Sequence, residues 1–261
     1  SDNSTDFGIN TLVAFDSASN DLFLRTYRLF EEKLMGRPNL VYRQVQAGTN
    51  ACFSIHTLDK VWADEYAALQ DIPMIDTVML RTPMILHPKS SKRTGMFTEI
   101  DTQPMTYFNK GESNWFCYPC KVGALLCFVY FNSKYMSSAL SMANLFELAT
   151  KEESAQKPDL VVIFGNDDGN DDTNFYYDEA NDIWVGCISD NPRIEYFGYL
   201  KKMCLTLHNL AQMKKGWLPI HGAFVNIYLK DGTKKGIMLM GDSGAGKSES
   251  IEALKAAAGD M

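Results

Sequence analysis

Large apolar side chains recur at helical spacing near the start of the chain. In residues 17–35 they fall at Phe23, Tyr27, Phe30 and Leu34. Positions three or four residues apart share one face of a helix, so this spacing predicts an amphipathic helix. A glycine and a proline follow, and we expect them to end that helix.

Shorter apolar runs bounded by polar residues predict strands in the middle of the chain. Residues 137–152 have a helical pattern instead, and "DLVVIFG" at 159–165 is typical of a buried strand. The other predicted strand runs are "LVYRQV" (40–45), "ACFSIHTL" (51–58), "DTVMLRTP" (76–83), "MFTEI" (96–100) and "KVGALLCFVYF" (121–131).

Two hairpins and a helix are predicted in the last hundred residues. "NFYYD" and "DIWVGCI" are joined through "EAN", and "AFVNIYL" and "GIMLM" flank a turn that contains Asp231 and Gly232. Both arrangements are typical of antiparallel hairpins. Residues 193–215 have the pattern of a helix. The whole order predicts an α/β fold whose mixed sheet has a substantial antiparallel component.

Composition and charge narrow the class of protein. The 261 residues are 46% hydrophobic and 12% aromatic, as in a globular protein with a core. A net charge of −7 argues against a general nucleic-acid binder, which carries a basic face. No apolar run of about 18 residues occurs, so we expect no membrane partner. The polar N-terminus has no signal-peptide pattern, which favours a cytoplasmic protein.

Two polar motifs are interpreted as structural. "CYPC" at 117–120 has CxxC spacing, but a zinc site needs a second ligand pair, so we interpret it as a turn. "NDDGNDD" at 166–172 has its glycine misplaced for an EF-hand and is interpreted as a solvated loop. The six cysteines are expected to be mostly buried free thiols. They are Cys52, Cys117, Cys120, Cys127, Cys187 and Cys204.

A glycine-rich motif near the end of the chain carries the clearest chemistry. "GDSGAGKS" at 241–248 matches GxxxxGK[ST] in full, after an apolar strand run and before a helical run. Such a loop cradles phosphate oxygens with backbone N–H groups, helped by the helix N-terminus. Lys247 would reach the outer phosphates, and the Ser248 hydroxyl would hold Mg²⁺. The predicted cradle is Gly241, Asp242, Ser243, Gly244, Ala245, Gly246, Lys247 and Ser248.

Phosphoryl transfer needs more than this loop. An acidic metal ligand on a neighbouring strand and a base are usual, and in most such proteins they follow the loop. Only "ESIEALKAAAGDM" remains after Ser248. We therefore expect an N-terminal fragment of a longer enzyme, inactive alone. Residues 1–210 would form an N-terminal α/β domain, and residues 211–261 the truncated beginning of a nucleotide-binding domain.

Residues 219–250 resemble the phosphate-loop region of the HPr kinase and phosphoenolpyruvate carboxykinase superfamily. That superfamily has a histidine ahead of a hairpin, followed by G-x-S-G-x-G-K-[ST]. The loop is most similar to the HPr kinase version, whereas its late position in the chain is similar to that in carboxykinases. The matching residues are His221, Ser243, Gly244, Gly246, Lys247 and Ser248.

This resemblance implies an ATP- or GTP-dependent enzyme with a carboxykinase-like N-terminal domain. The reaction would convert oxaloacetate and nucleoside triphosphate into phosphoenolpyruvate and CO₂. Lys247 and His221 would be catalytic, and Ser248 and His221 would bind Mg²⁺, with Mn²⁺ as a further candidate ion. Two alternatives stay open: a protein serine kinase that acts on a small phosphocarrier protein, and a non-catalytic nucleotide-binding module.

The remaining candidates are weaker. Lys89, Lys92 and Arg93 form a basic cluster, whose Arg-Thr-Gly is similar to a carboxykinase substrate segment but also suits a solvated loop. His56 and His208 are interpreted as structural. Counting back from the Asp231–Gly232 turn places His221 at the loop end of its hairpin.

Overall fold

The computed structural model describes residues 40–46, 49–57, 62–80, 93–241 and 245–258. The predicted helix at 17–35 lies outside these residues. Contacts divide the chain into residues 1–208 and 209–261, within α5 (Gly198–Lys214). The domain boundary expected after residue 210 stays a prediction, because a division by contacts does not show that either part folds alone.

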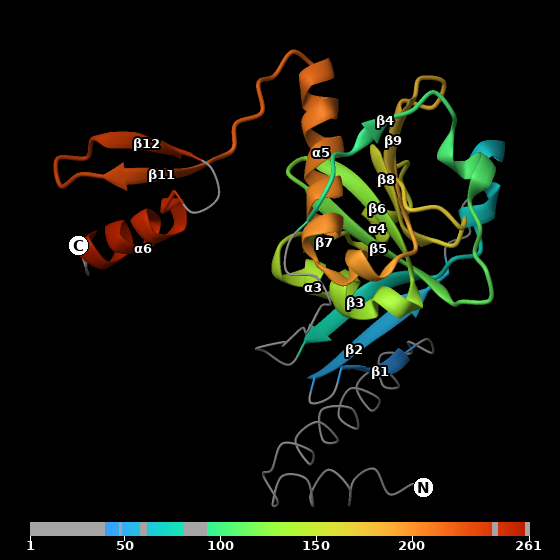
Figure 1. Ribbon diagram of the computed structural model, residues 1–261. Helices are drawn as coiled ribbons and strands as arrows, with labels where there is room; N and C mark the ends of the chain where they lie inside the picture. The colour runs from blue at the N-terminus through green and yellow to red at the C-terminus, as the bar shows by residue number, and fades with distance from the viewer. Residues whose placement is uncertain (1–39, 47–48, 58–61, 81–92, 242–244, 259–261) are drawn as a thin grey trace, which may run out of the picture. The chain divides into compact units, whose positions relative to one another are not determined.

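The larger unit is built on one mixed sheet (Figure 1). Its strand order is β1-β2-β3-β5-β6-β8-β10-β9-β4, and β7 pairs with β5. The strands are β1 (Leu40–Gln46), β2 (Thr49–His56), β3 (Met74–Leu80), β4 (Thr98–Glu99), β5 (Trp115–Val122), β6 (Leu125–Asn132), β7 (Glu147–Leu148), β8 (Leu160–Asn166), β9 (Thr173–Asp178) and β10 (Ile183–Ser189).

Antiparallel and parallel pairs share this sheet. Pairs β1–β2, β2–β3, β5–β6, β5–β7 and β9–β10 are antiparallel, whereas β6–β8 and β8–β10 are parallel. The predicted α/β class with an antiparallel component is confirmed. The predicted hairpin of "NFYYD" and "DIWVGCI" is also confirmed, as β9 and β10.

Short helical segments surround the sheet, and the long helix α5 lies along one face of it (Figure 1). A methyl group added to Gly186 of β10 would lie 2.6 Å from Cγ of Met203, so α5 packs directly on this strand. The short segments are η1 (Asp64–Leu69), η2 (Pro104–Tyr107), η3 (Ser133–Tyr135), α3 (Met136–Ser141), η4 (Met142–Asn144), α4 (Lys151–Ser154) and η5 (Pro192–Glu195).

Strands β6 and β8 form the centre of the core. Every residue of both strands is buried. Such strands need cover on both sheet faces, which explains why their sequences are apolar throughout instead of alternating. Trp62, Tyr66 and Met105 cover one face, in one cluster with Phe128 of β6 and Val161 of β8.

The helix predicted over residues 137–152 is wrong, because the segment is broken. It contains α3, η4, β7 and the start of α4. Thr150 ends the irregular part by capping α4: its hydroxyl accepts a hydrogen bond from Glu153 N, and the Glu153 carboxylate accepts one from Thr150 N. This reciprocal capping box starts a new helix instead of continuing the first.

Three further expectations are corrected at β4, β5 and β6. The "CYPC" motif lies inside β5 and is not a turn. The single run at 121–131 is two strands, since Gly123, with φ of 62°, turns the chain and Val122 pairs with Leu125. A glycine at the first position of a two-residue turn is typical of a type II′ hairpin. In "MFTEI" only Thr98 and Glu99 are strand.

Five cysteines of the described chain are free and buried, and we expect them to resist modification in the folded protein. Burial raises the pKa of the Cys120 thiol. Hydrogen bonds to neighbouring thiols, together with burial, raise the pKa values of the Cys127 and Cys204 thiols well above the usual value. A thiol reacts as the thiolate, so these groups need unfolding to react. The five are Cys117, Cys120, Cys127, Cys187 and Cys204.

The measurement is Ellman's reagent on a Cys52→Ser variant, so that only these five thiols are counted. The native variant should show no fast phase of reaction with the reagent, and all five thiols should react once guanidinium has unfolded the protein. A thiol that reacts within minutes at pH 8 without denaturant would contradict the expectation.

Candidate phosphate-binding site

The glycine-rich motif follows a two-stranded hairpin in residues 209–261. Strands β11 (Gly222–Tyr228) and β12 (Lys234–Met240) pair antiparallel, from Gly222 opposite Met240 to Tyr228 opposite Lys234. The turn is closed by a 2.8 Å bond from Leu229 N to Thr233 O, and Gly232 has φ of 84°. The predicted hairpin is confirmed.

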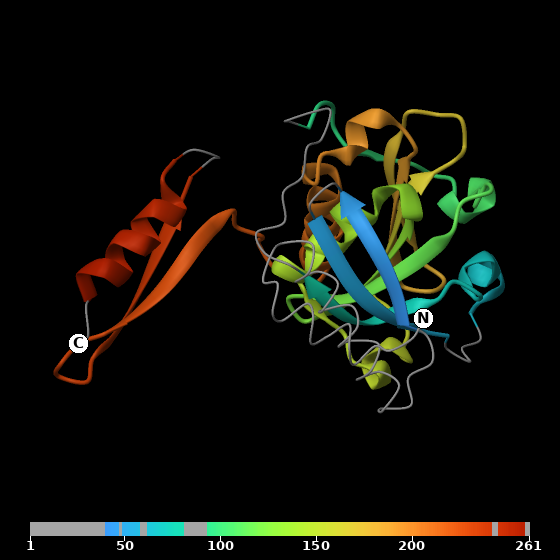
Figure 2. The ribbon, with the colours of Figure 1, turned by 90° about the horizontal axis from the view of Figure 1, so that it is seen from below.

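Helix α6 (Lys247–Ala258) follows the motif and lies along one face of the hairpin (Figure 2). Val225 and Ile227 of β11 line a cavity of about 560 Å³ together with Ile251 and Leu254 of α6. Apolar side chains of α6 and β11 therefore face one shared hollow. Its N-terminus follows directly from the motif at the end of β12, where the axial backbone dipoles favour negative charge.

The two ends of the glycine-rich loop lie against each other. A methyl group at Gly241 would lie 2.7 Å from Cβ of Ala245, a distance that real Cβ atoms avoid, so the site requires glycine. Gly246 has φ of 77°, in the left-handed region that glycine tolerates. Its carbonyl accepts bonds from N and Oγ of Ser250, at 2.9 and 2.8 Å.

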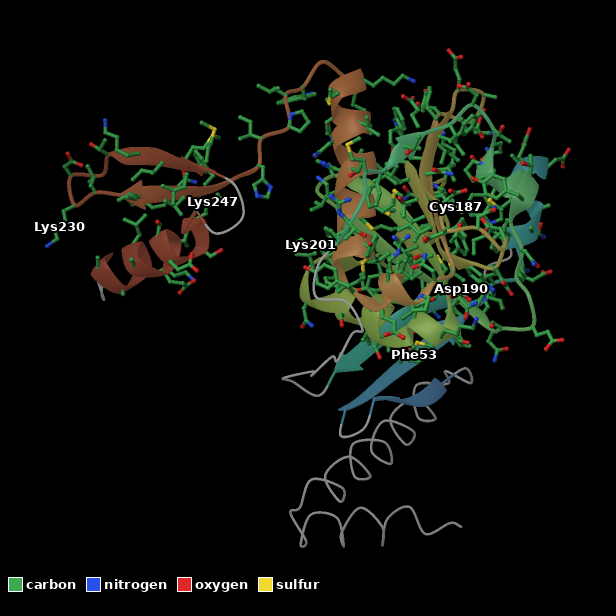
Figure 3. The ribbon with its side chains drawn as sticks, viewed as in Figure 1. Phe53, Cys187, Asp190, Lys201, Lys230 and Lys247 are labelled. Carbon is green, nitrogen blue, oxygen red and sulfur yellow. The ribbon has the colours of Figure 1, made fainter. Side chains whose placement is uncertain are left out.

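Lys247 is the half-buried first residue of α6, and its side chain reaches back along the loop. Its Nζ donates a 2.5 Å hydrogen bond to the carbonyl oxygen of Gly241. In Figure 3, Lys247 is at the loop end of the hairpin and Lys230 at the opposite, turn end. Ser248 is exposed in the first helical turn. Asp242, Ser243 and Gly244 lie outside the described residues, and their roles stay predictions.

His221 lies at the same end of the hairpin as the loop, as counting from the turn predicted. It directly precedes Gly222, which pairs with Met240, and it is exposed. The direction of its ring and its role as a metal ligand stay predictions. Among the described residues, no three His, Cys, Asp or Glu side chains gather closely enough to hold a metal ion.

The basic cluster is represented in the described residues by Arg93 alone. Its Nη1 donates to the carbonyl of Gly95 at 2.5 Å, and its guanidinium lies 5.0 Å from the Phe97 ring centre. The next residue, Thr94, donates its N–H to the Tyr199 hydroxyl at 3.0 Å. Arg93 therefore belongs to a loop that is docked on the first turn of α5.

A polar cluster that the sequence interpretation missed lies where β6, β8 and β10 end. Carboxyl ends of adjacent parallel strands meet at one sheet edge, which is where ligands bind in many α/β folds. Lys134 Nζ bonds to Asp190 Oδ2 at 2.5 Å, and the Tyr135 hydroxyl also donates to Asp190. The signal for this cluster was the polar residues that follow each apolar run.

Beside β8, the loop that follows η2 is hydrogen-bonded to this edge of the sheet. The Asn166 side-chain oxygen accepts a 2.9 Å bond from Asn109 N, and Asn109 Nδ2 donates to the Asp167 carbonyl at 2.7 Å. The Asp168 carboxylate is bonded by Asn166 and Ser189, at 3.0 and 3.1 Å. These mutual bonds hold the loop after η2 against the sheet, and the following acidic loop is mostly exposed, as predicted.

A second cluster that was missed surrounds His56 of β2. Its side chain is buried, neither ring nitrogen has a hydrogen-bond partner among the described groups, and Nδ1 lies 3.7 Å from Asp76 Oδ2. Ser54 donates to Asp76, and Lys151 Nζ lies 3.6 Å from the same carboxylate. Burial lowers the pKa of His56; Asp76 opposes this shift and Lys151 adds to it.

This lowered pKa predicts an acid-sensitive contribution to folding stability. Below a pH of about 6.5 the unfolded histidine binds a proton that the folded histidine resists, so His56 should lower stability as pH falls through that value. Urea unfolding at pH 5, 6, 7 and 8 should show a steeper acid loss for the wild type than for His56→Gln. Parallel curves for the two proteins would contradict this.

Comparisons with known proteins found no similarity to draw on. No family model matches the chain, and neither the curated proteins nor the solved structures that were searched contain a match. In the part of the chain that the structure describes, no helix is both long and apolar enough to cross a bilayer.

Proposed function

We propose that this chain binds the phosphates of ATP or GTP through residues 241–248 and contributes this site to a phosphoryl-transfer enzyme. The observation that carries the proposal is the close approach of Gly241 and Ala245 between β12 and α6, with Lys247 reaching back to Gly241. A full GxxxxGK[ST] sequence in a strand–loop–helix context supports phosphate binding more strongly than either feature would alone.

Each described residue has a distinct task in this proposal. Gly241 and Gly246 let the backbone come close to phosphate oxygens, where a side chain would obstruct it. The first N–H groups of α6 bind anionic oxygens. Lys247 exchanges its bond with the Gly241 carbonyl for the outer phosphates. When bound, Mg²⁺ neutralises phosphate charge; Ser248 would hold it, and His221 would hold that ion or Mn²⁺.

The reaction that we favour is of the carboxykinase type, with oxaloacetate as the dicarboxylate substrate. Its support is the resemblance of residues 219–250 and the loop-end position of His221. A protein serine kinase that acts on a small phosphocarrier protein is the second candidate, supported by the loop sequence. The acidic charge and the buried free thiols support a cytoplasmic setting without nucleic-acid partners.

The first experiment is a calorimetric titration of residues 1–261 with ATP and GTP, each with and without Mg²⁺. The proposal expects binding that weakens when Mg²⁺ is removed. The absence of any detectable heat of binding up to millimolar nucleotide would reject the proposal. Purified protein that contains these residues should then be assayed separately with oxaloacetate and with a phosphocarrier protein. Consumption of oxaloacetate would favour the carboxykinase reaction, and phosphorylation of the carrier protein would favour the protein kinase.

A further inference from the structure

Strand β11 has a free edge that lacks the usual protection against pairing. In the part of the chain that the structure describes, β11 pairs with β12 alone. Edge strands commonly avoid unwanted partners with charged side chains, lysine above all, or with proline. β12 begins with Lys234 and Lys235, whereas β11, "GAFVNIY", has no charged residue and no proline. Its apolar side chains on both faces are typical of a strand inside a sheet.

Every second residue of β11 directs its backbone N–H and C=O away from β12. Opposite residues of an antiparallel pair alternate between hydrogen-bonded and non-hydrogen-bonded positions. The bond from Leu229 N to Thr233 O fixes the phase of this alternation, so the outward positions are Phe224, Asn226 and Tyr228. In the described chain, none of these three N–H groups donates to the backbone of a loop or helix. They are donors for a further strand.

The hollow between β11 and α6 lies along this free edge. Consecutive residues of β11, 225–228, line its volume of about 560 Å³ together with Ile251, Leu254, Lys255 and Ala257 of α6. No described residue of β12 lines it, and α6 packs mainly on β11. At about 3.3 Å per residue, four strand residues extend over about 13 Å. The hollow therefore has an extended backbone on one side and an apolar helix face on another.

The turn end of the hairpin has an excess of positive charge. Helix α6 runs from the loop end toward the turn, so its last turns lie at the turn end (Figures 1 and 2). Tyr228 and Lys255 both line the hollow, and Lys234 Nζ lies 5.5 Å from the ring centre of Tyr228. The four lysines and two carboxylates of the turn, of the start of β12 and of this part of α6 are Lys230, Lys234, Lys235, Lys255, Asp231 and Glu252.

We propose that the free edge of β11 binds one further β-strand from a partner polypeptide. The partner segment is extended, with apolar side chains at alternate positions facing the hollow and a carboxylate at the basic turn end. In such strand addition, main-chain bonds supply affinity and pockets for alternate side chains supply specificity. A second copy of this chain matches less well, because neither β11 nor β12 has an acidic residue to meet Lys255. This inference is independent of the proposed phosphate site.

The first test is amide hydrogen exchange of the full 261-residue chain. The probe is a capped peptide of three Thr-Val repeats between two aspartates, which is acidic at both ends and so can bind in either direction. With saturating peptide, we expect the N–H groups of Phe224, Asn226 and Tyr228 to exchange about tenfold more slowly. The outward N–H groups of Gly236 and Met238 on β12 are the internal control and should not change. No protection of β11 at millimolar peptide, or equal protection of β12, overturns the proposal.

Two substitutions on α6 test the hollow itself. Ala257→Trp places a large side chain in the hollow and should abolish the protection by peptide. Ala253→Trp is the matched control: Ala253 is exposed one turn earlier on α6, does not line the hollow, and its substitution should leave the protection unchanged. Circular dichroism verifies that both variants remain helical. Protection that persists in Ala257→Trp overturns the hollow as the binding site.

Charge and self-pairing are tested last. The same peptide with lysines in place of its aspartates should bind about threefold to tenfold more weakly, because exposed charge pairs each contribute modestly. Equal affinity of the two peptides overturns the acidic character of the partner. Protection of the β11 edge that rises with protein concentration, in the absence of peptide, would assign the edge to a second copy of the chain and overturn the proposal.

Discussion

Replacing Lys247 by alanine should weaken nucleotide binding by tenfold or more, a loss of about 1.4 kcal/mol in binding free energy. The side chain supplies a positive charge at the end of the loop where the outer phosphates are expected, and alanine removes that charge without disturbing the helix. Calorimetric titration with ATP and Mg²⁺ measures the change.

Lys255→Ala is the matched control for this substitution. It removes one positive charge from the same helix, but Lys255 lies two turns further along α6 and pairs with Glu252. Its affinity should stay within about twofold of the wild type, because an exposed pair contributes little. Equal affinity of Lys247→Ala and Lys255→Ala would remove Lys247 from the phosphate site.

Replacing Gly165 by alanine should destabilise the larger unit by about 3 kcal/mol. Gly165 has φ of 87°, and a methyl group there would lie 2.7 Å from two ring carbons of Tyr135. The left-handed backbone alone costs alanine about 1–2 kcal/mol, and overpacking against a buried ring adds about 1–3 kcal/mol. The Tyr135 hydroxyl is held by Asp190, so the ring cannot easily move.

The neighbouring loop offers the control for Gly165. Gly169 has φ of 74° and nothing lies within 4 Å of an added methyl group. Gly169→Ala should therefore cost only the backbone part, about 1–2 kcal/mol. Urea unfolding followed by tryptophan fluorescence compares the two variants. Equal losses would show that the contact with Tyr135 adds nothing.

Sequence periodicity predicted the elements whose neighbours are close in the chain. The β11–β12 and β9–β10 hairpins are specified by local turns, so their patterns sufficed. Helical spacing predicted a helix at 193–215, and the structure has α5 over Gly198–Lys214, preceded by the separate short segment η5. The failures have local causes too. The Gly123 turn was hidden because apolar residues flank it on both sides, and the run at 137–152 hid a second N-cap at Thr150.

The candidate site was predictable only in part. The loop sequence identified Lys247 as a candidate phosphate ligand, because the motif has a fixed geometry, but it did not predict the bond from Lys247 to the Gly241 carbonyl. The polar groups around Asp190 and His56 depend on which strands become neighbours. Parallel partners such as β6 and β8 are separated by a long crossover, and no short-range pattern identifies them. Their side chains could not be grouped before the topology was known.

The central position of β8 has a consequence for how quickly the sheet can assemble. Its neighbours β6 and β10 each belong to a hairpin, β5–β6 and β9–β10, whose strands meet across short turns. Hairpins close in about 1–10 μs, whereas pairing distant segments first incurs the entropy of a long loop. We expect the two hairpins to form early and to remain separate until β8 joins them. The rate-limiting barrier then lies in the docking of this apolar strand. Until β8 has docked, the edges of β6 and β10 that it will pair with stay open and prone to aggregation.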